Sequence, residues 1–158
     1  MRTLLIGFLV LTSLGCGVTA EDGWHAFGAV DGALVTLSSD SRERGFVGEL
    51  CRAAPDEVEI DVRLGAWVTS SQSVAVEATL TTPDEEYVET IMVDGRTRLG
   101  IDDTDTLLDP ELACSEGVGV RFALPDEAAD VEIQWVLHYG FRADEELVDT
   151  RVELMDAP

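Results

Sequence analysis

Residues 57–64 read Glu-Val-Glu-Ile-Asp-Val-Arg-Leu, a strict alternation of charged and aliphatic side chains. Successive side chains of an extended strand point to opposite faces, so this order places four aliphatic groups on one face and four charges on the other. The period is two residues, not the 3.6 residues of a helix. The stretch therefore predicts a β-strand with one face in a core and the other in water.

The same two-residue period recurs along the chain from Trp24 onward. Asp31-Gly32 and Asp94-Gly95 separate strand-like runs, and Asp-Gly is typical of tight hairpin turns. The expected strands cover residues 24–30, 33–38, 44–51, 57–68, 73–82, 86–93, 96–101, 117–124, 131–142 and 147–155. Many short strands without a long helix predict an all-β protein, an antiparallel β-sandwich formed by one domain over residues 21–158.

Cys51, Trp67 and Cys114 are spaced much like the Cys-Trp-Cys frame of immunoglobulin domains, and in this respect the chain resembles that family. The resemblance implies an immunoglobulin-like architecture. Three departures argue against membership in the family. Trp67 lies off the apolar face of its strand, and Leu112 stands where the family has a tyrosine. Residues 115–158 are also too many for the single strand that follows the second cysteine in immunoglobulin domains.

The first twenty residues have the layout of a signal peptide. Met1-Arg2-Thr3 supplies a short basic start, residues 4–14 form an uncharged and mostly apolar run, and small residues follow. A bilayer span needs roughly 20 apolar residues, so this run is too short to be a membrane anchor. The sequence therefore predicts export from the cytoplasm.

Two cleavage sites compete in this segment. Small residues at Val18-Thr19-Ala20 suit an ordinary signal peptidase cutting before Glu21. Leu14-Gly15-Cys16 resembles the lipobox of bacterial lipoproteins, which implies cleavage before Cys16, a diacylglycerol on its sulfur and, from Gly17, sorting to the outer membrane. The expected mature form is an outer-membrane lipoprotein on the periplasmic or surface face, and the alternative is a periplasmic or secreted protein.

The mature domain keeps two cysteines, Cys51 and Cys114, under either cleavage. In an oxidising compartment we expect them to form a disulfide, with two free buried thiols as the alternative. No Cys/His spacing indicates a zinc site.

Charge excludes several partners. The chain has a net charge of −22, and all ten of its basic residues are arginine. Such a surface repels phosphate backbones and anionic headgroups, so we expect no nucleic acid and no membrane contact except through a lipid anchor at Cys16.

The acidic stretch 102–111 is the strongest candidate for a metal site. Asp103, Asp105 and Asp109 are expected calcium ligands, because calcium takes six to eight oxygens and acids at alternate loop positions supply several. The EF-hand pattern fails for lack of its glycine and its final glutamate. The alternative is a solvated loop in which Asp109 caps a helical turn that reaches Ser115.

No catalytic constellation is visible in the sequence. His25 and His138 are far apart, and no serine elbow, zinc-protease motif or phosphate-binding loop is present. Trp67 is a candidate for stacking on a carbohydrate or a protein partner, neither identified. We therefore expect a non-catalytic envelope module that binds or supports a partner and needs no cofactor. The alternatives are a calcium-dependent adhesion or structural module using residues 102–109, and an envelope hydrolase.

Overall fold

The computed structural model describes residues 24–53, 58–83, 85–108, 114–125, 129–143 and 149–157. The expected signal peptide, with Cys16 and both cleavage sites, lies outside these residues. The strands are β1 (Trp24–Asp31), β2 (Val35–Leu37), β3 (Glu43–Ala53), β4 (Val58–Thr81), β5 (Glu86–Leu108), β6 (Cys114–Ala123), β7 (Val131–Ala143) and β8 (Asp149–Asp156). Every pairing is antiparallel, which confirms the expected all-β antiparallel class.

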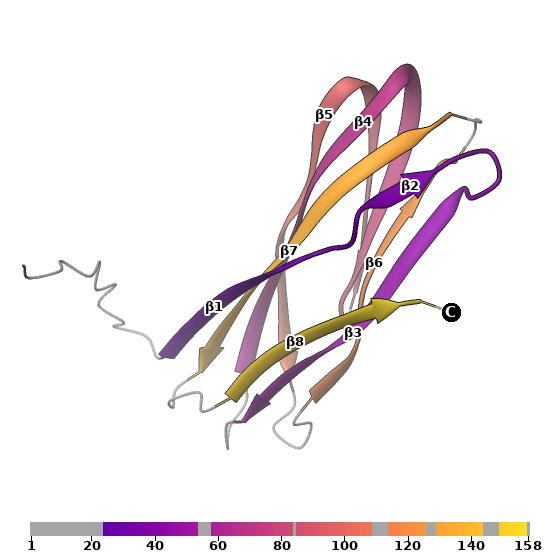
Figure 1. Cartoon of the computed structure of the whole chain (residues 1–158). Coiled ribbons are helices and arrows are strands. Elements are labelled where there is room, and N and C mark those ends of the chain that lie inside the picture. The colour runs from indigo at the N-terminus through magenta and orange to yellow at the C-terminus, as the bar shows by residue number, and fades with distance from the viewer. Residues whose placement is uncertain are drawn as a thin grey trace, which may run out of the picture.

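One curled sheet contains all eight strands (Figure 1). Its order is β1-β7-β4-β6-β3-β8, with β2 also pairing with β7 and β5 pairing with β4. The first part of β4 pairs with β7 and its last part pairs with β6, so β4 joins the two halves of the sheet. The two halves face each other, because Trp135 of β7 packs against Phe46 of β3 and Phe122 of β6. The result is a sandwich-like enclosure built from a single sheet.

Two pairs of expected strands are in fact single long strands. The expected strands 57–68 and 73–82 fall together on β4, which runs over Val58–Thr81, and residues 86–93 and 96–101 belong to β5. The pairing jumps from Ser70–Gly95 to Val74–Val93, so both strands bend there, and Figure 1 shows them arching together. The expected hairpin at Asp94-Gly95 was therefore wrong. Gly95 does adopt a positive φ of +72°, which glycine tolerates. The chain bends at this glycine and does not reverse, because β4 remains paired with β5 on both sides of it.

The second expected hairpin, at Asp31-Gly32, was also wrong. Strands β1 and β2 both pair with β7 and follow each other along its edge instead of pairing together. Here the Gly32 amide donates to the Trp135 carbonyl at 3.0 Å. A Cβ on Gly32 would overlap the Trp135 indole, so glycine is needed at this position for a close approach.

The alternation in residues 57–64 predicted the buried face correctly where side chains are described. Val62 and Leu64 are fully buried, and Arg63 between them is exposed. The largest fully buried side chains come from β2, β4, β5, β6 and β7: Phe122, Leu37, Leu64, Leu80, Leu99, Ile133, Leu137 and Val62. Both halves of the sheet thus contribute to one core, and the opposite faces are left for solvent or a partner.

Candidate functional site

Trp67 stands on the outer face of the sheet half formed by β7, β4 and β5. Its neighbours on β4, Ala66 and Val68, point into the core, and this alternation turns Trp67 outward. Its backbone lies opposite Gln134 of β7 and Arg98 of β5. The side chain is 46% exposed, which confirms that it lies off the apolar face of its strand.

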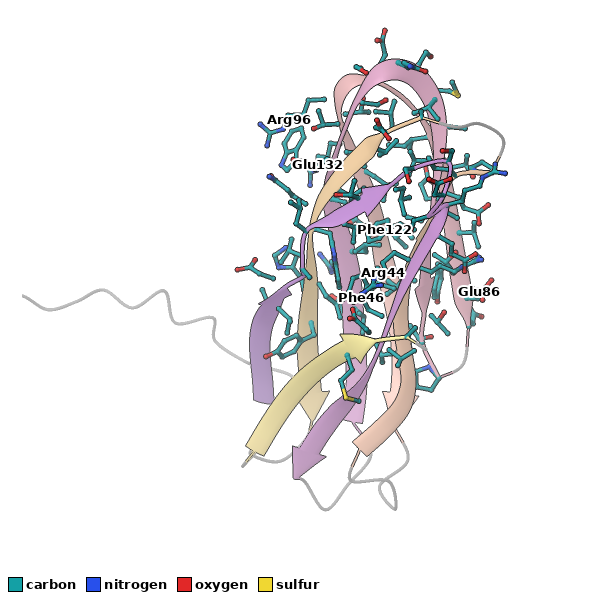
Figure 2. All side chains as sticks on the ribbon, turned by 45° about the vertical axis from the view of Figure 1, so that its right-hand side comes forward. Arg44, Phe46, Glu86, Arg96, Phe122 and Glu132 are labelled. Atoms are coloured by element: carbon teal, nitrogen blue, oxygen red, sulfur yellow. The ribbon has the colours of Figure 1, made fainter. Side chains whose placement is uncertain are left out.

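Arg96 holds the indole from one side. Its guanidinium carbon lies 4.6 Å from the centre of the Trp67 ring, a cation–π contact worth about 0.5–1 kcal/mol at an exposed site. Thr69 separates Arg96 on β5 from Glu132 on β7, and Figure 2 shows those two labelled side chains on the same side of the molecule. The contact restricts the ring to a preferred orientation.

A strip without side chains lies next to this ring. Gly65 of β4 is opposite Gly100 of β5, one row away from Trp67 and Arg98. A Cβ on Gly65 would meet only Val136 Cγ1 at 3.6 Å, and one on Gly100 would meet the Leu64 carbonyl at 3.6 Å and Asp102 Oδ2 at 4.0 Å. Neither Trp67 nor Arg98 therefore covers the glycines. Together Trp67, Arg96, Arg98, Gln134, Gly65 and Gly100 form what we term the Trp67 surface.

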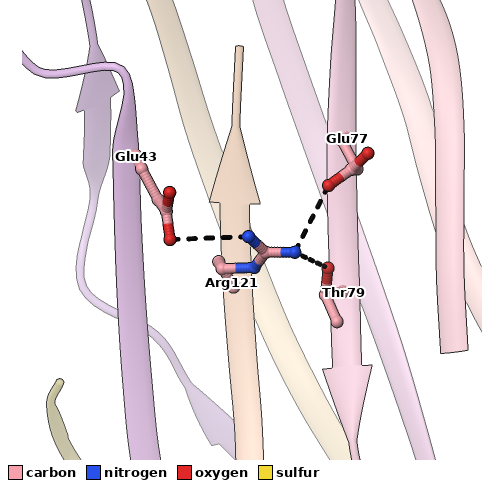
Figure 3. A network of polar contacts seen from close by, with 4 residues as sticks. All are labelled: Glu43, Glu77, Thr79 and Arg121. Carbon is pink, nitrogen blue, oxygen red and sulfur yellow. Dashed lines mark hydrogen bonds and ion pairs between the residues drawn. The ribbon is translucent and has the colours of Figure 1, made fainter. Parts of the chain in front are cut away.

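A second polar cluster surrounds Arg121 on the outer face of the other sheet half. Arg121 Nη1 lies 3.5 Å from Glu43 Oε1, and Nη2 lies 3.4 Å from Glu77 Oε1 and 3.1 Å from Thr79 Oγ1 (Figure 3). Arg121, Glu43 and Thr79 line an open cavity of about 560 Å³. Two carboxylates already pair with Arg121, and Arg44, the other arginine of the described lining, is paired with Asp156, so this cavity offers no unpaired positive charge to a ligand.

His138 lines a smaller cavity of about 320 Å³ together with Asp61, Arg63 and Tyr139. Arg63 donates to both oxygens of Asp61, at 3.2 and 2.6 Å, so the carboxylate is engaged with the arginine. The described lining residues include no serine, cysteine or threonine that could pair with His138 as a hydroxyl or thiol nucleophile.

The two histidines are not brought together. On the β1–β7 pairing His25 lies opposite Arg142, whereas His138 lies opposite Ala29, four residues further along. The His25 side chain is outside the described residues. Among the side chains that are described, no three His, Cys, Asp or Glu residues are close enough together to hold a metal ion.

The acidic stretch is a strand where a loop was expected. Residues 102–108 continue β5, with Asp105 opposite Asp61 and Thr104 opposite Val62. Residues 58–62 of β4 pair with residues 104–108, and this pairing supplies partners to the backbone N–H and C=O groups of both segments. Ser115 belongs to β6 and not to a helical turn. The side chains of Asp103, Asp105 and Asp109 lie outside the described residues, so the calcium site stays a prediction.

Cys51 and Cys114 are direct partners in the β3–β6 pairing. Opposed residues of antiparallel strands have Cα atoms about 4.5–5.5 Å apart, within the roughly 4.4–6.8 Å that a disulfide needs. This backbone register is compatible with the expected disulfide, whose side-chain atoms are outside the described residues. The two strands are neighbours in one sheet, whereas the immunoglobulin frame joins two sheets.

The site residues that sequence reasoning missed are Arg96 and Arg98. Their spacing within the expected strand 96–101 placed both on one face. Nothing local indicated that this face continues across β4 to Trp67, since that depends on a pairing between residues about thirty positions apart.

The described part of the chain also contains no helix long and apolar enough to cross a membrane.

Comparison with known proteins assigns no family. No family model and no curated protein matches the chain. A crystal structure of an infectious bursal disease virus particle aligns over 85% of this chain and 40% of the viral chain, with 10% identity and a TM-score of 0.28. A structure of the Gx strain of that virus aligns over 87% and 38%, with 13% identity and a TM-score of 0.17. The chain spans about two fifths of these viral chains, and likenesses this low carry no argument about function.

Proposed function

We propose that this chain is an exported, non-catalytic binding module of the cell envelope, with the Trp67 surface as its binding face. The observation that carries the proposal is a tryptophan, 46% exposed, held by a stacked arginine beside a glycine strip. Tryptophan is enriched at binding surfaces because it offers a large apolar area with few rotatable bonds.

The exposed indole of Trp67 favours binding energetically. A partner that covers it removes apolar area from water, which stabilises the complex by about 25 cal/mol per Å². Because Arg96 already orients the ring, the Trp67 side chain loses less conformational entropy on binding than a freely rotating side chain would. Because the two glycines carry no side chain of their own, a flat ligand can approach the backbone beside the ring, between Val136 and Asp102.

We further propose that the mature protein is an outer-membrane lipoprotein anchored through Cys16. A fully extended chain from Cys16 to the start of β1 at Trp24 reaches at most about 28 Å. The anchor therefore keeps the domain close to the membrane, while the net charge of −22 disfavours contact between the sheet and anionic headgroups.

The anchor predicts a defined mass for the native protein. Protein purified from the producing cell's membranes should begin at Cys16 and carry a diacylglycerol, and the Cys16→Ser variant should lose its partition into detergent. Intact-mass spectrometry checks this, with detergent phase separation as the second readout. A mature chain that begins at Glu21 without lipid would overturn the anchor and leave the binding face untouched.

The binding face predicts that Trp67→Ala weakens attachment to the envelope. We expect the variant to bind at least tenfold more weakly to protein-stripped envelope polysaccharide, because loss of a central interface tryptophan typically costs 2 kcal/mol or more. Sedimentation of the detergent-solubilised mature protein with this material measures the affinity.

A matched control removes exposed apolar area elsewhere. Met92 is 64% exposed on the other half of β5, so Met92→Ala should retain the wild-type affinity. Circular dichroism of both variants should match that of the wild type. Equal retention of wild type and Trp67→Ala would reject the Trp67 surface as the binding face.

A further inference from the structure

Four of the six arginines whose side chains are described are paired with acceptors. Arg44 lies 2.7 Å from Asp156, and Arg63 and Arg121 are paired with carboxylates as described above. Arg42 donates to the carbonyls of Leu124 and Pro125, each at 3.1 Å. Such pairing is expected in a chain with 32 acidic and ten basic residues.

Arg96 and Arg98 are the exceptions among the arginines whose side chains are described. Neither has a carboxylate partner among those residues, and both are exposed. They are two positions apart on β5, about 6.6 Å along one face; Arg98 lies directly opposite Trp67, and Arg96 lies opposite Thr69 in the next row of that face. The two unpaired cations therefore lie together on the Trp67 surface.

We infer that the Trp67 surface binds an acidic saccharide, whose carboxylates contact Arg96 and Arg98 while a sugar ring packs on Trp67. This inference rests on the proposed binding function and names its ligand class. A pyranose ring presents an apolar C–H face to an indole and hydroxyl groups to polar neighbours such as Gln134 and Thr69. Guanidinium groups bind carboxylates through charge-assisted and often bidentate hydrogen bonds.

The net negative charge of the protein does not prevent this. At physiological ionic strength the Debye length is about 8 Å, so acids on distant strands are largely screened at the Trp67 surface. Two acids border the face: Glu132, which lies beyond Thr69 on β7, and Asp102, whose Oδ2 lies 4.0 Å from the position of a Cβ on Gly100. Neither of these described side chains forms an ion pair with Arg96 or Arg98. The cations of the Trp67 surface are thus Arg96 and Arg98, and its two bordering acids leave them unpaired.

The position of Trp67 favours a saccharide over an acidic peptide. Extended peptides commonly bind by adding a strand to a free sheet edge or by filling apolar pockets. Residues 64–70 of β4 are paired on both sides, with β5 and with β7, so their backbone has no free edge. The glycine strip beside the ring is open and not a pocket, so recognition depends on side chains that meet a flat ligand.

The test measures binding of the mature, detergent-solubilised protein to three polymers. The probes are polygalacturonate, the same polymer with its carboxylates methyl-esterified, and poly-glutamate. We expect binding to polygalacturonate that weakens at least tenfold on esterification and at least tenfold in the Arg96→Gln/Arg98→Gln double variant. Affinity electrophoresis or calorimetry gives the dissociation constants.

Arg44→Gln is the matched control, because Arg44 is exposed, ion-paired and remote on β3. It removes a positive charge and should leave the affinity unchanged. If the double variant and Arg44→Gln bind alike, the arginine pair is not the site.

The remaining outcomes separate this inference from the proposed function. Equal binding of the acidic and esterified polymers would overturn the acidic ligand and leave a binding face at Trp67. Preference for poly-glutamate would overturn the saccharide in favour of a peptide. Failure to bind any of the three polymers would overturn the ligand class, and the proposed function would then depend on the envelope assay with Trp67→Ala.

Discussion

Replacing Trp135 with alanine is expected to lower the free energy of unfolding by about 3–5 kcal/mol. Trp135 is only 5% exposed, and its ring lies 4.9 Å from that of Phe46 and 5.8 Å from that of Phe122. Its Nε1 also donates to the Ala33 carbonyl at 2.9 Å. The substitution opens a cavity where the two halves of the sheet meet and leaves that carbonyl without its partner. Urea unfolding followed by circular dichroism measures the loss.

Two companion variants locate the cause. Trp135→Phe keeps an aromatic ring but loses the indole donor, so its cost should fall clearly below that of alanine. Trp67→Ala removes an equally large side chain from the outer face and should cost about 1 kcal/mol or less. Equal losses for Trp135→Ala and Trp67→Ala would show that Trp135 does not join the two halves as the ring contacts indicate.

Reduction of a Cys51–Cys114 disulfide is expected to cost about 4 kcal/mol of stability, because the bond closes a loop over residues 52–113 in the unfolded chain. The opposed backbone positions on β3 and β6 are compatible with the bond. A protein with the usual stability of about 5–15 kcal/mol would lose a large part of it. Urea unfolding with and without reductant measures the change, and a mass deficit of two hydrogens shows the bond.

The double variant Cys51→Ser/Cys114→Ser supplies the control. It should unfold like the reduced wild type and should not respond to reductant. If native protein purified without reductant alkylates at both cysteines, the thiols are free and the disulfide does not exist.

The positions of these residues suggest how the scaffold serves the proposed function. The core that Trp135 closes supports the inner side of β4, and the outer side of the same strand presents Trp67. Because β4 is paired on both sides, the indole and the two arginines stand on backbone that is hydrogen-bonded across three strands. A binding face on paired strands is more rigid than one on loops, which reduces the entropy lost on binding.

The sequence predicted the strands better than their connections. The outward position of Trp67 and the buried positions of Val62 and Leu64 followed from alternation alone, and all three are confirmed. The two Asp-Gly pairs were interpreted as hairpins, because a local sequence that tolerates positive φ does not reveal whether the chain reverses or only bends. At Gly95 the partner strand β4 runs on through the bend, and at Gly32 the ring of Trp135 occupies the space beside the backbone.

By itself the sequence determined the all-β class, the inward and outward faces of the described strands and the acidic surface. These are local properties, since the two-residue period follows from the geometry of an extended backbone. Only the tertiary structure decided that β4 and β5 are continuous, that Cys51 lies opposite Cys114, and that Arg98 lies beside Trp67. Strand order and register are set by packing between residues distant in the chain, and this packing is not encoded in any single stretch.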